Sequence, residues 1–132
     1  MGLFQFITEG FTLHSGGRSN FKIECDALTN DDIECLAWMI RKLVPNFKEV
    51  YGVPRGGLRL EKVLKKYEKG AGPILIVDDV YTTGNSMREF TREVVLRKYD
   101  ETSQPLRFIV LFARTKTPEW IIPLFQLWGE IE

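Results

Sequence analysis

The stretch ILIVDDVYTTGNS, residues 74–86, constrains the fold of this chain more than any other. Its four leading aliphatic residues do not alternate with polar ones, which is typical of a strand covered on both faces in a parallel sheet. Asp78 and Asp79 end the apolar run, and small polar residues follow before the helical spacing of Met87 and Phe90 begins. The stretch therefore predicts a buried strand that turns directly into a helix, at the sheet edge where open α/β folds bind ligands.

Other segments predict further strands around this one. They cover residues 47–53, 107–113 and 121–128. The last would lie at an edge, because Pro123 lacks the N–H that a central strand donates. Residues 11–28 alternate around a Ser-Gly-Gly turn and predict a hairpin. We therefore predict one domain over residues 1–132, with a hairpin in residues 1–28 and a small, mostly parallel α/β sheet flanked by helices in residues 29–132.

Three helices are predicted between these strands from apolar residues at three- and four-residue spacing. The first covers residues 29–44 and begins at Thr29 and Asp32, which form the pattern of a capping box. Its expected apolar face consists of Ile33, Leu36, Ala37, Ile40, Leu43 and Val44. The expected faces of the other two helices are Leu60, Val63, Leu64 and Tyr67, and Met87, Phe90 and Val94.

Composition narrows the classes of partner. Eighteen basic and eighteen acidic residues cancel, so the charge gives no case for binding nucleic acid or an anionic membrane. No apolar run approaches the ~20 residues of a membrane span, and the start of the chain lacks the pattern of a secretory signal. Cys25 and Cys35 lack a metal-ligand pattern; they predict two reduced, buried thiols, with a disulfide as the alternative. We expect a cytoplasmic protein.

The polar part of residues 74–86 predicts a phosphate site. Small residues at a helix start let several backbone N–H groups point at one anion, helped by the helix dipole. The residues of this cradle would be Thr82, Thr83, Gly84, Asn85 and Ser86. Asp78 and Asp79 would repel a second phosphate but suit neighbouring hydroxyls, so the pattern indicates a ribose 5-phosphate site. The alternative is an ordinary turn with two solvated aspartates. The Lys-Ser/Thr pair of a Walker loop is missing.

Residues 74–86 resemble the signature of the type I phosphoribosyltransferases, in which four apolar residues, two acidic ones and two apolar positions precede small residues around a glycine. Tyr81 departs from that pattern, which prefers an aliphatic residue there. The resemblance implies that Asp78 and Asp79 hold the ribose hydroxyls of phosphoribosyl pyrophosphate. It also implies that the cradle residues wrap the 5′-phosphate.

A second stretch, YGVPRGG at residues 51–57, resembles the pyrophosphate loop of the same family. By this resemblance, pyrophosphate would be bound by Pro54, Arg55, Gly56 and Gly57. The glycines allow close backbone approach, and Arg55 can hold two phosphate oxygens at once. Arg55 would thus act with Asp78 and Asp79 in catalysis. The alternative for this stretch alone is a mere turn, and Arg59 is either a helper or a solvated helix residue.

Residues 11–21, FTLHSGGRSNF, resemble the N-terminal hood of orotate phosphoribosyltransferases. His14 stands where that family has a lysine, and Lys22 and Ile23 where it has aromatic residues, so we expect orotate to be a poor substrate. The candidates for contact with the base are His14, Lys22, Arg114 and Trp120. His14 could equally be a turn residue bonded to the backbone, and Arg114 and Trp120 could be strand-end and core residues.

A short connection separates the two loops. Only one helix and the sequence EKGAG lie between Gly57 and Ile74, where orotate enzymes carry further strands and a mobile lid with a catalytic lysine. In purine-type relatives, an aspartate stands at the position of Thr82. The resemblance therefore implies a truncated, lid-less phosphoribosyltransferase. The alternative is a non-catalytic module that binds phosphoribosyl pyrophosphate or a nucleotide.

The expected reaction transfers a 5-phosphoribosyl group between pyrophosphate and a nitrogenous base. The expected partners are phosphoribosyl pyrophosphate or a nucleoside monophosphate, and the base. Mg²⁺ would be the cofactor, carried by the substrate without a metal site of the protein's own. A homodimer is what the family suggests.

Overall fold

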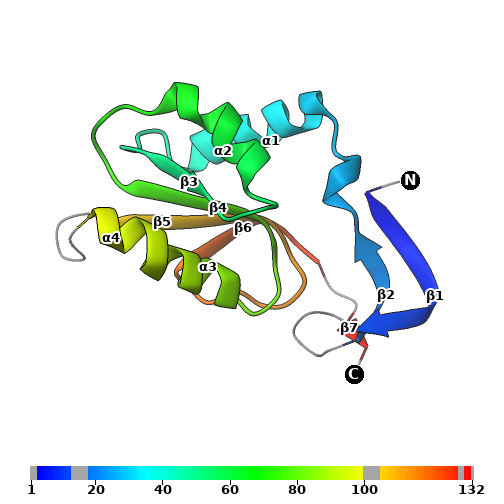
Figure 1. The fold of residues 1–132 in the computed structure, drawn as a ribbon. Helices are drawn as coiled ribbons and strands as arrows, with labels where there is room; N and C mark the ends of the chain where they lie inside the picture. The colour runs from blue at the N-terminus through cyan, green and yellow to red at the C-terminus, as the bar shows by residue number, and fades with distance from the viewer. Residues whose placement is uncertain (1–2, 13–17, 100–104, 128–129, 132) are drawn as a thin grey trace.

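A computed structural model describes residues 3–12, 18–99, 105–127 and 130–131, with side chains in residues 3, 23–99 and 105–127 (Figure 1). Its centre is a parallel sheet with the strand order β3-β4-β5-β6. The strands are β3 (Val50–Gly52), β4 (Ile74–Tyr81), β5 (Leu106–Ala113) and β6 (Ile121–Gln126). The predicted α/β sheet is confirmed, and the strand that contains Pro123 lies at its edge.

Helices cover both faces of this sheet (Figure 1). Helices α1 (Asn30–Leu43) and α2 (Leu58–Leu64) pack on one face. On the other lies a continuous helical segment made of α3 (Asn85–Phe90), a π-helical turn (Thr91–Val95) and α4 (Leu96–Lys98). Along β4, Leu75 and Val77 face α1 and α2, whereas Ile74 and Ile76 face α3. Burial on both faces is why this strand is apolar without alternation.

The first helix begins as its sequence predicts. Thr29 Oγ1 accepts a hydrogen bond from the N–H of Asp32 at 3.1 Å, and Asp32 Oδ2 accepts one from the N–H of Thr29 at 2.9 Å. This confirms the capping box. The predicted apolar face is wrong at Leu43, which is 51% exposed, while Val44 is buried. The helix ends at Leu43, and Val44 has a non-helical backbone that turns its side chain into the core.

The π-helical turn shifts the buried face of the third helix by one residue. Met87 and Phe90 pack against the sheet as predicted, but Val94 is 45% exposed and Val95 is buried. A π-helix closes its hydrogen bonds over five residues instead of four, which rotates the following side chains. Within the turn, the buried Thr91 donates from Oγ1 to the carbonyl of Met87 at 2.7 Å. The prediction for Val94 is therefore wrong.

The N-terminal hairpin, named the hood, lies beside the core (Figure 1). It pairs β1 (Phe4–Thr12) with β2 (Arg18–Ile23) in antiparallel orientation. Both strands lie within residues 1–28, where the hairpin was predicted, and β1 begins before the alternating stretch that starts at residue 11. The predicted Ser-Gly-Gly turn lies outside the described residues, and a 3₁₀-helix (Cys25–Ala27) follows β2. Strand β7 (Glu130–Ile131) pairs with β2, so a segment predicted for the core joins the hood.

Backbone N–H groups of the edge strand β3 donate hydrogen bonds to side chains from the segment that follows it. The N–H of Gly52 donates to Glu61 Oε1 and the N–H of Val50 donates to Glu68 Oε2, both at 2.9 Å. Residues 58–73 are all described; they form α2, a 3₁₀ turn (Lys65–Tyr67) and a bend, without a strand. The short connection thus caps the sheet edge. Within the described ranges, no helix has the length and apolarity to cross a bilayer.

Candidate functional site

The carboxyl ends of β3 and β4 bring the two predicted loops together. Gly52 lies opposite Val77 in the parallel register, so the loop after β3 reaches the end of β4. A Cβ atom on Gly56 would lie 2.2 Å from Cγ of Asp79, which means that the carboxylate packs directly on the glycine backbone. The structure therefore joins two motifs that are far apart in the sequence.

A small cavity of about 50 Å³ lies at the start of α3. Its lining includes Asp78 and the whole predicted cradle, Thr82, Thr83, Gly84, Asn85 and Ser86. Gly84 is the N-cap of α3 and has a φ of +80°, a left-handed conformation that favours glycine. Because Gly84 has no side chain, none of its own atoms caps the helix start. The residues predicted to bind a phosphate thus line one small cavity, in which the N–H of Asn85 donates to Thr83 Oγ1 at 3.3 Å.

Two hydrogen bonds fix the loop that forms this cavity. Thr115 Oγ1 donates to the carbonyl of Thr82 at 3.0 Å, and the N–H of Arg114 donates to the carbonyl of Tyr81 at 3.2 Å. The segment after β5 thus holds the segment after β4. Thr115 was not predicted as a site residue, because a single threonine in a loop carries no local signal for a contact between the segments after two strands.

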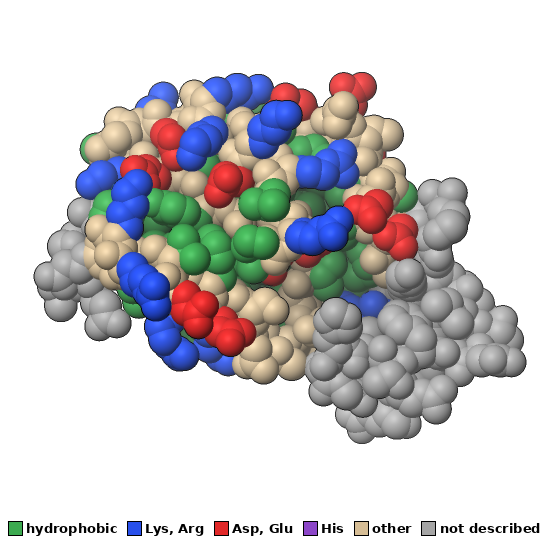
Figure 2. Space-filling view, viewed as in Figure 1, with side chains coloured by type: hydrophobic (Ala, Val, Ile, Leu, Met, Phe, Trp, Pro, Cys, Tyr) green, Lys and Arg blue, Asp and Glu red, His purple; other side chains and the backbone are tan. Residues whose placement is uncertain are grey.

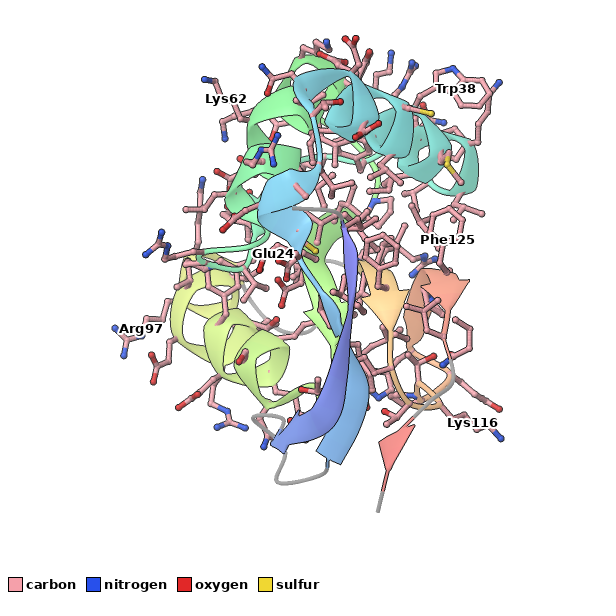
Figure 3. All side chains as sticks on the ribbon, turned by 90° about the vertical axis from the view of Figure 1, so that its right-hand side faces the viewer. Glu24, Trp38, Lys62, Arg97, Lys116 and Phe125 are labelled. Atoms are coloured by element: carbon pink, nitrogen blue, oxygen red, sulfur yellow. The ribbon has the colours of Figure 1, made fainter. Side chains whose placement is uncertain are left out.

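A larger cavity of about 480 Å³ lies between the hood and the core. Arg55, Gly56 and Asp79 line its core side, and the segment after β2 lines the other side with Glu24, Cys25 and Asp26. Apolar side chains complete the lining, among them Ile23, Leu28, Ile33, Leu58, Val80 and Leu111. Figure 3 shows Glu24 at the centre of the view, where the hood meets the core. The segment after β2 was not predicted to be part of a site. Its Cys25 is half-buried and Cys35 on α1 is exposed, so the prediction of two buried thiols is wrong.

Asp78 lines the small cavity and the following Asp79 lines the large one, while Val80 lines both. The N–H of Asp79 donates to Asp78 Oδ1 at 2.8 Å, and the N–H of Val80 donates to Asp79 Oδ1 at 2.7 Å. Burial and the neighbouring Asp79 raise the pKa of Asp78 well above its ordinary value. A ligand that brings hydroxyl donors or a cation would stabilise the charged pair.

Only half of the predicted pyrophosphate loop lines the large cavity. Arg55 and Gly56 do so, whereas Pro54 and Gly57 line neither cavity. Gly57 is buried, and a Cβ on it would lie 2.5 Å from the N atom of Val53 and from the carbonyl oxygen of Val77. Packing within the protein therefore requires glycine at position 57.

Arg59 ties the core to the segment after the hood. Its Nη2 donates to the carbonyl of Leu28 at 2.9 Å and contacts Asn30 Oδ1 at 3.4 Å. The guanidinium is therefore half-buried against the chain that leads into α1 and also lines the large cavity. Arg59 was predicted to be either a helper of the pyrophosphate loop or a solvated helix residue, and neither prediction included this contact.

Of the four base-side candidates, the structure describes the side chains of Arg114 and Trp120, and it does not bring these two together. Arg114 is 5% exposed and lines neither cavity. Trp120 precedes β6, at the end of the sheet opposite the loops, and packs edge-to-face on Phe108 with a centroid distance of 4.9 Å. Lys22 lies in β2 without a described side chain, and His14 lies outside the described residues.

The described residues contain no group of three or more His, Cys, Asp or Glu side chains that could hold a metal ion. Figure 2 shows basic and acidic side chains intermixed over the described part of one face. The site is thus distinguished by its shape and by its half-buried carboxylates.

The sheet, its helices and this pair of loops define the class of fold. The chain has the fold of the type I phosphoribosyltransferases, a parallel sheet between helices with an N-terminal hairpin beside the carboxyl ends of the strands. Neither a protein-family model nor a curated protein sequence matches the chain.

Similar solved structures are orotate phosphoribosyltransferases. The enzyme from Aeropyrum pernix superposes with a TM-score of 0.69 at 20% identity, over 94% of this chain and 88% of that one. The Mycobacterium tuberculosis enzyme gives 0.67 at 12% identity, over 93% and 88%, and the Francisella tularensis enzyme gives 0.62 at 16% identity, over 94% and 80%. At these identities the similarity establishes the fold.

Proposed function

We propose that this chain is a phosphoribosyltransferase that binds phosphoribosyl pyrophosphate and transfers its 5-phosphoribosyl group to or from a nitrogenous base. The observation that carries the proposal is the position of Asp78 and Asp79 on the walls of two cavities, both of which Val80 also lines. The residues of the predicted phosphate cradle line one cavity, and Arg55 lines the other. A ligand with a phosphate at each end and a diol between them matches that arrangement.

Each residue then has a separate task. The cradle around Gly84 would bind the 5′-phosphate, and the two aspartates would accept hydrogen bonds from the ribose hydroxyls. Arg55 would hold the pyrophosphate as it leaves, because a guanidinium offers two parallel donors to phosphate oxygens. The remaining volume beside the hood would take the base. Such positioning lowers the barrier by fixing the two reactants at the anomeric carbon.

Mg²⁺ fits this site as an ion that arrives with the substrate. Two carboxylates without a third protein ligand suit an ion that keeps waters and binds substrate phosphates. Neutralisation of the charge on the leaving pyrophosphate is the chemistry that the bound ion would supply. A homodimer and a cytoplasmic location stay predictions.

Product formation tests the proposal directly. The chain would be incubated with phosphoribosyl pyrophosphate, Mg²⁺ and a panel of bases, and nucleoside monophosphates would be detected by mass spectrometry. We expect one base to yield its monophosphate together with pyrophosphate. Tight binding without any product would support the alternative of a binding module, and the absence of binding would contradict both.

We expect Arg55→Ala to weaken binding of phosphoribosyl pyrophosphate but to leave binding of ribose 5-phosphate almost unchanged. A charge-assisted hydrogen bond contributes about 1.5–3 kcal/mol, and roughly 1.4 kcal/mol is tenfold in affinity, so the loss should be tenfold or more. Calorimetry with both ligands measures the difference.

Arg97→Ala is the matched control for this variant, since Arg97 is exposed on α4 and points away from the site (Figure 3). It removes the same side chain and the same charge, and both affinities should stay at the wild-type value. Equal losses for the two ligands in Arg55→Ala would show that Arg55 does not contact the leaving group.

We expect orotate to be a poor substrate or none. The hood residues that the orotate family uses for its base are replaced here by His14, Lys22 and Ile23, so the base-side contacts are changed. Turnover with orotate would be compared with turnover of uncharged bases at equal concentration. Orotate turnover as fast as that of any other base would refute it.

A further inference from the structure

A series of hydrogen bonds crosses the carboxyl ends of β6, β5 and β4. Gln126, the last residue of β6, is paired with Ala113, the last residue of β5. Its half-buried side-chain Nε2 lies 3.0 Å from the carbonyl oxygen of Thr115 and 3.2 Å from that of Ala113. The carbonyl oxygen of Leu127 lies 3.4 Å away. Gln126 thus holds the backbone of the segment after β5 where it leaves the sheet.

The segment held in this way presents the Thr115 hydroxyl to the loop after β4. Thr115 Oγ1 donates to the carbonyl of Thr82 at 3.0 Å. This carbonyl and the N–H of Thr83 belong to one planar trans peptide unit, so they point in opposite directions. The bond from Thr115 therefore fixes the direction of the Thr83 N–H and also polarises it as a donor.

The Thr83 N–H is an available donor. Within the described ranges, no residue accepts a hydrogen bond from it. Thr82 and Thr83 both line the small cavity, whereas Thr115 and Gln126 line neither cavity. The two residues that fix this peptide unit thus lie behind the cavity wall, and a ligand in the cavity would leave their hydrogen bonds intact.

We propose that Thr115 is a positioning residue for the phosphate cradle, and that Gln126 holds Thr115 in place. The pair orients the peptide unit between Thr82 and Thr83, so that its N–H is directed at a phosphate oxygen before the ligand binds. This inference rests on the proposed function, in which the cradle binds the 5′-phosphate. It adds residues from the ends of β5 and β6 to a site that the sequence places after β3 and β4.

The contact can be tested without any ligand. The amide resonance of Thr83 in the isotope-labelled chain would be compared by NMR between the wild type and three variants. Thr115→Val keeps the shape of threonine but cannot donate, so it should shift this resonance. Thr115→Ser keeps the hydroxyl and should stay near the wild type. An unshifted Thr83 resonance in a folded Thr115→Val protein overturns the contact.

Thr117→Val is the matched control. Thr117 lies two residues further along the same segment, is also half-buried, and lines neither cavity. In the described part of the chain, its hydroxyl makes no hydrogen bond to a cradle residue. The same substitution there should leave the Thr83 resonance and every ligand affinity at the wild-type value.

Ligand affinities test the positioning role. Loss of one hydrogen bond predicts roughly three- to tenfold weaker binding of ribose 5-phosphate in Thr115→Val, measured by calorimetry. Binding of pyrophosphate, which the loop around Arg55 would hold, should stay at the wild-type value. Thr115→Ser should recover most of the affinity for ribose 5-phosphate, because it restores the donor.

Gln126→Met tests the second residue of the pair. Methionine is similar in length and flexible but cannot donate an N–H to the three carbonyls. The variant should also bind ribose 5-phosphate more weakly. If Gln126 acts through Thr115, the double variant should lose little more than Thr115→Val alone. A double variant whose loss is the product of the two single losses would overturn the role of Gln126.

The possible outcomes separate this inference from the proposed function. If the wild type binds ribose 5-phosphate and Thr115→Val binds it equally well, the positioning role is overturned and the proposed function stands. Equal losses for ribose 5-phosphate and pyrophosphate in Thr115→Val would also overturn it, since general loosening of the fold would then explain the loss. A wild type that binds neither phosphoribosyl pyrophosphate nor ribose 5-phosphate overturns the proposed function, and the NMR experiment still decides whether Thr115 holds the peptide unit.

Discussion

At a pH above the raised pKa of Asp78, about 8, this carboxyl is ionised. There, Asp78→Asn should weaken binding of phosphoribosyl pyrophosphate by roughly 10- to 100-fold, because a charged acceptor contributes about 1.5–3 kcal/mol and each 1.4 kcal/mol is tenfold. The amide has nearly the same shape as the carboxylate, and its carbonyl oxygen can still accept the N–H of Asp79, now bonded at 2.8 Å. The fold should therefore be kept. Calorimetry with and without Mg²⁺ would show the loss, and the response to Mg²⁺ should fall with it.

The same variant should be more stable than the wild type above neutral pH. Burial and Asp79 raise the pKa of Asp78 in the folded state above that in the unfolded chain. The folded state therefore holds this proton more tightly, so the free energy of unfolding falls as pH rises from the ordinary carboxyl range through the raised pKa. Asparagine does not titrate. The difference in melting temperature should be small near pH 4 and should grow towards pH 9.

Two further variants complete this test. Asp79→Asn should also lose affinity, whereas Asp31→Asn removes an exposed carboxylate at the start of α1 and should change little. Wild-type affinity in both Asp78→Asn and Asp79→Asn would contradict the assignment of the ribose site to these residues. It would also contradict the proposed phosphoribosyltransferase function. A wild-type protein that melts at or above the temperature of Asp78→Asn throughout this pH range would contradict the raised pKa.

Gly84→Val should abolish binding of the 5′-phosphate. Gly84 has a φ of +80°, which strongly disfavours a β-branched residue, and a Cβ atom there would lie 2.9 Å from Cε1 of Tyr81. The side chain would fill the cradle of about 50 Å³ or displace the loop that forms it. Binding of ribose 5-phosphate, measured by calorimetry, should fall below detection, and circular dichroism would verify that the variant is folded.

Gly70→Val separates loss of the cradle from backbone strain. Gly70 has a similar φ of +73°, lies in an exposed bend after α2, and has open space where a Cβ would be. Both variants bear the same kind of strain, of the order of 1–3 kcal/mol. Only Gly84→Val should lose the ligand. Retained binding in a folded Gly84→Val protein would show that this turn is not the phosphate cradle.

The predictions from sequence succeeded where the signal is local. The alternation-free run of β4 indicated burial on both faces, the pair Thr29 and Asp32 indicated a capping box, and Pro123 indicated an edge strand. Each rests on contacts within a few residues, or on a property of one residue type. The failures at Leu43 and Val94 arose where a helix end and a π-helical turn changed which side chain faces the core.

Contacts between distant segments had no such signal. The Thr115 hydroxyl reaches the carbonyl of Thr82 only because β4 and β5 are paired, and Cys25 and Asp79 line one cavity only because the segment after β2 lies beside the core. Trp120 was a candidate for contact with the base from its sequence alone. The direction of β6 places its side chain at the end of the sheet opposite the two loops.

The sequence by itself determined the α/β class, the order of the core strands and helices, and the two loops that carry glycine and charge, since periodicity, capping and turn chemistry act over short distances. Tertiary structure alone decided that Asp78 and Asp79 line two different cavities. It also decided that Gly56 contacts the carboxylate of Asp79 and that Gly57 packs against the backbone of Val53 and Val77. It also brought β7 back to the hood. These features depend on how strands align and which segments cross, and that is set by packing of the whole chain.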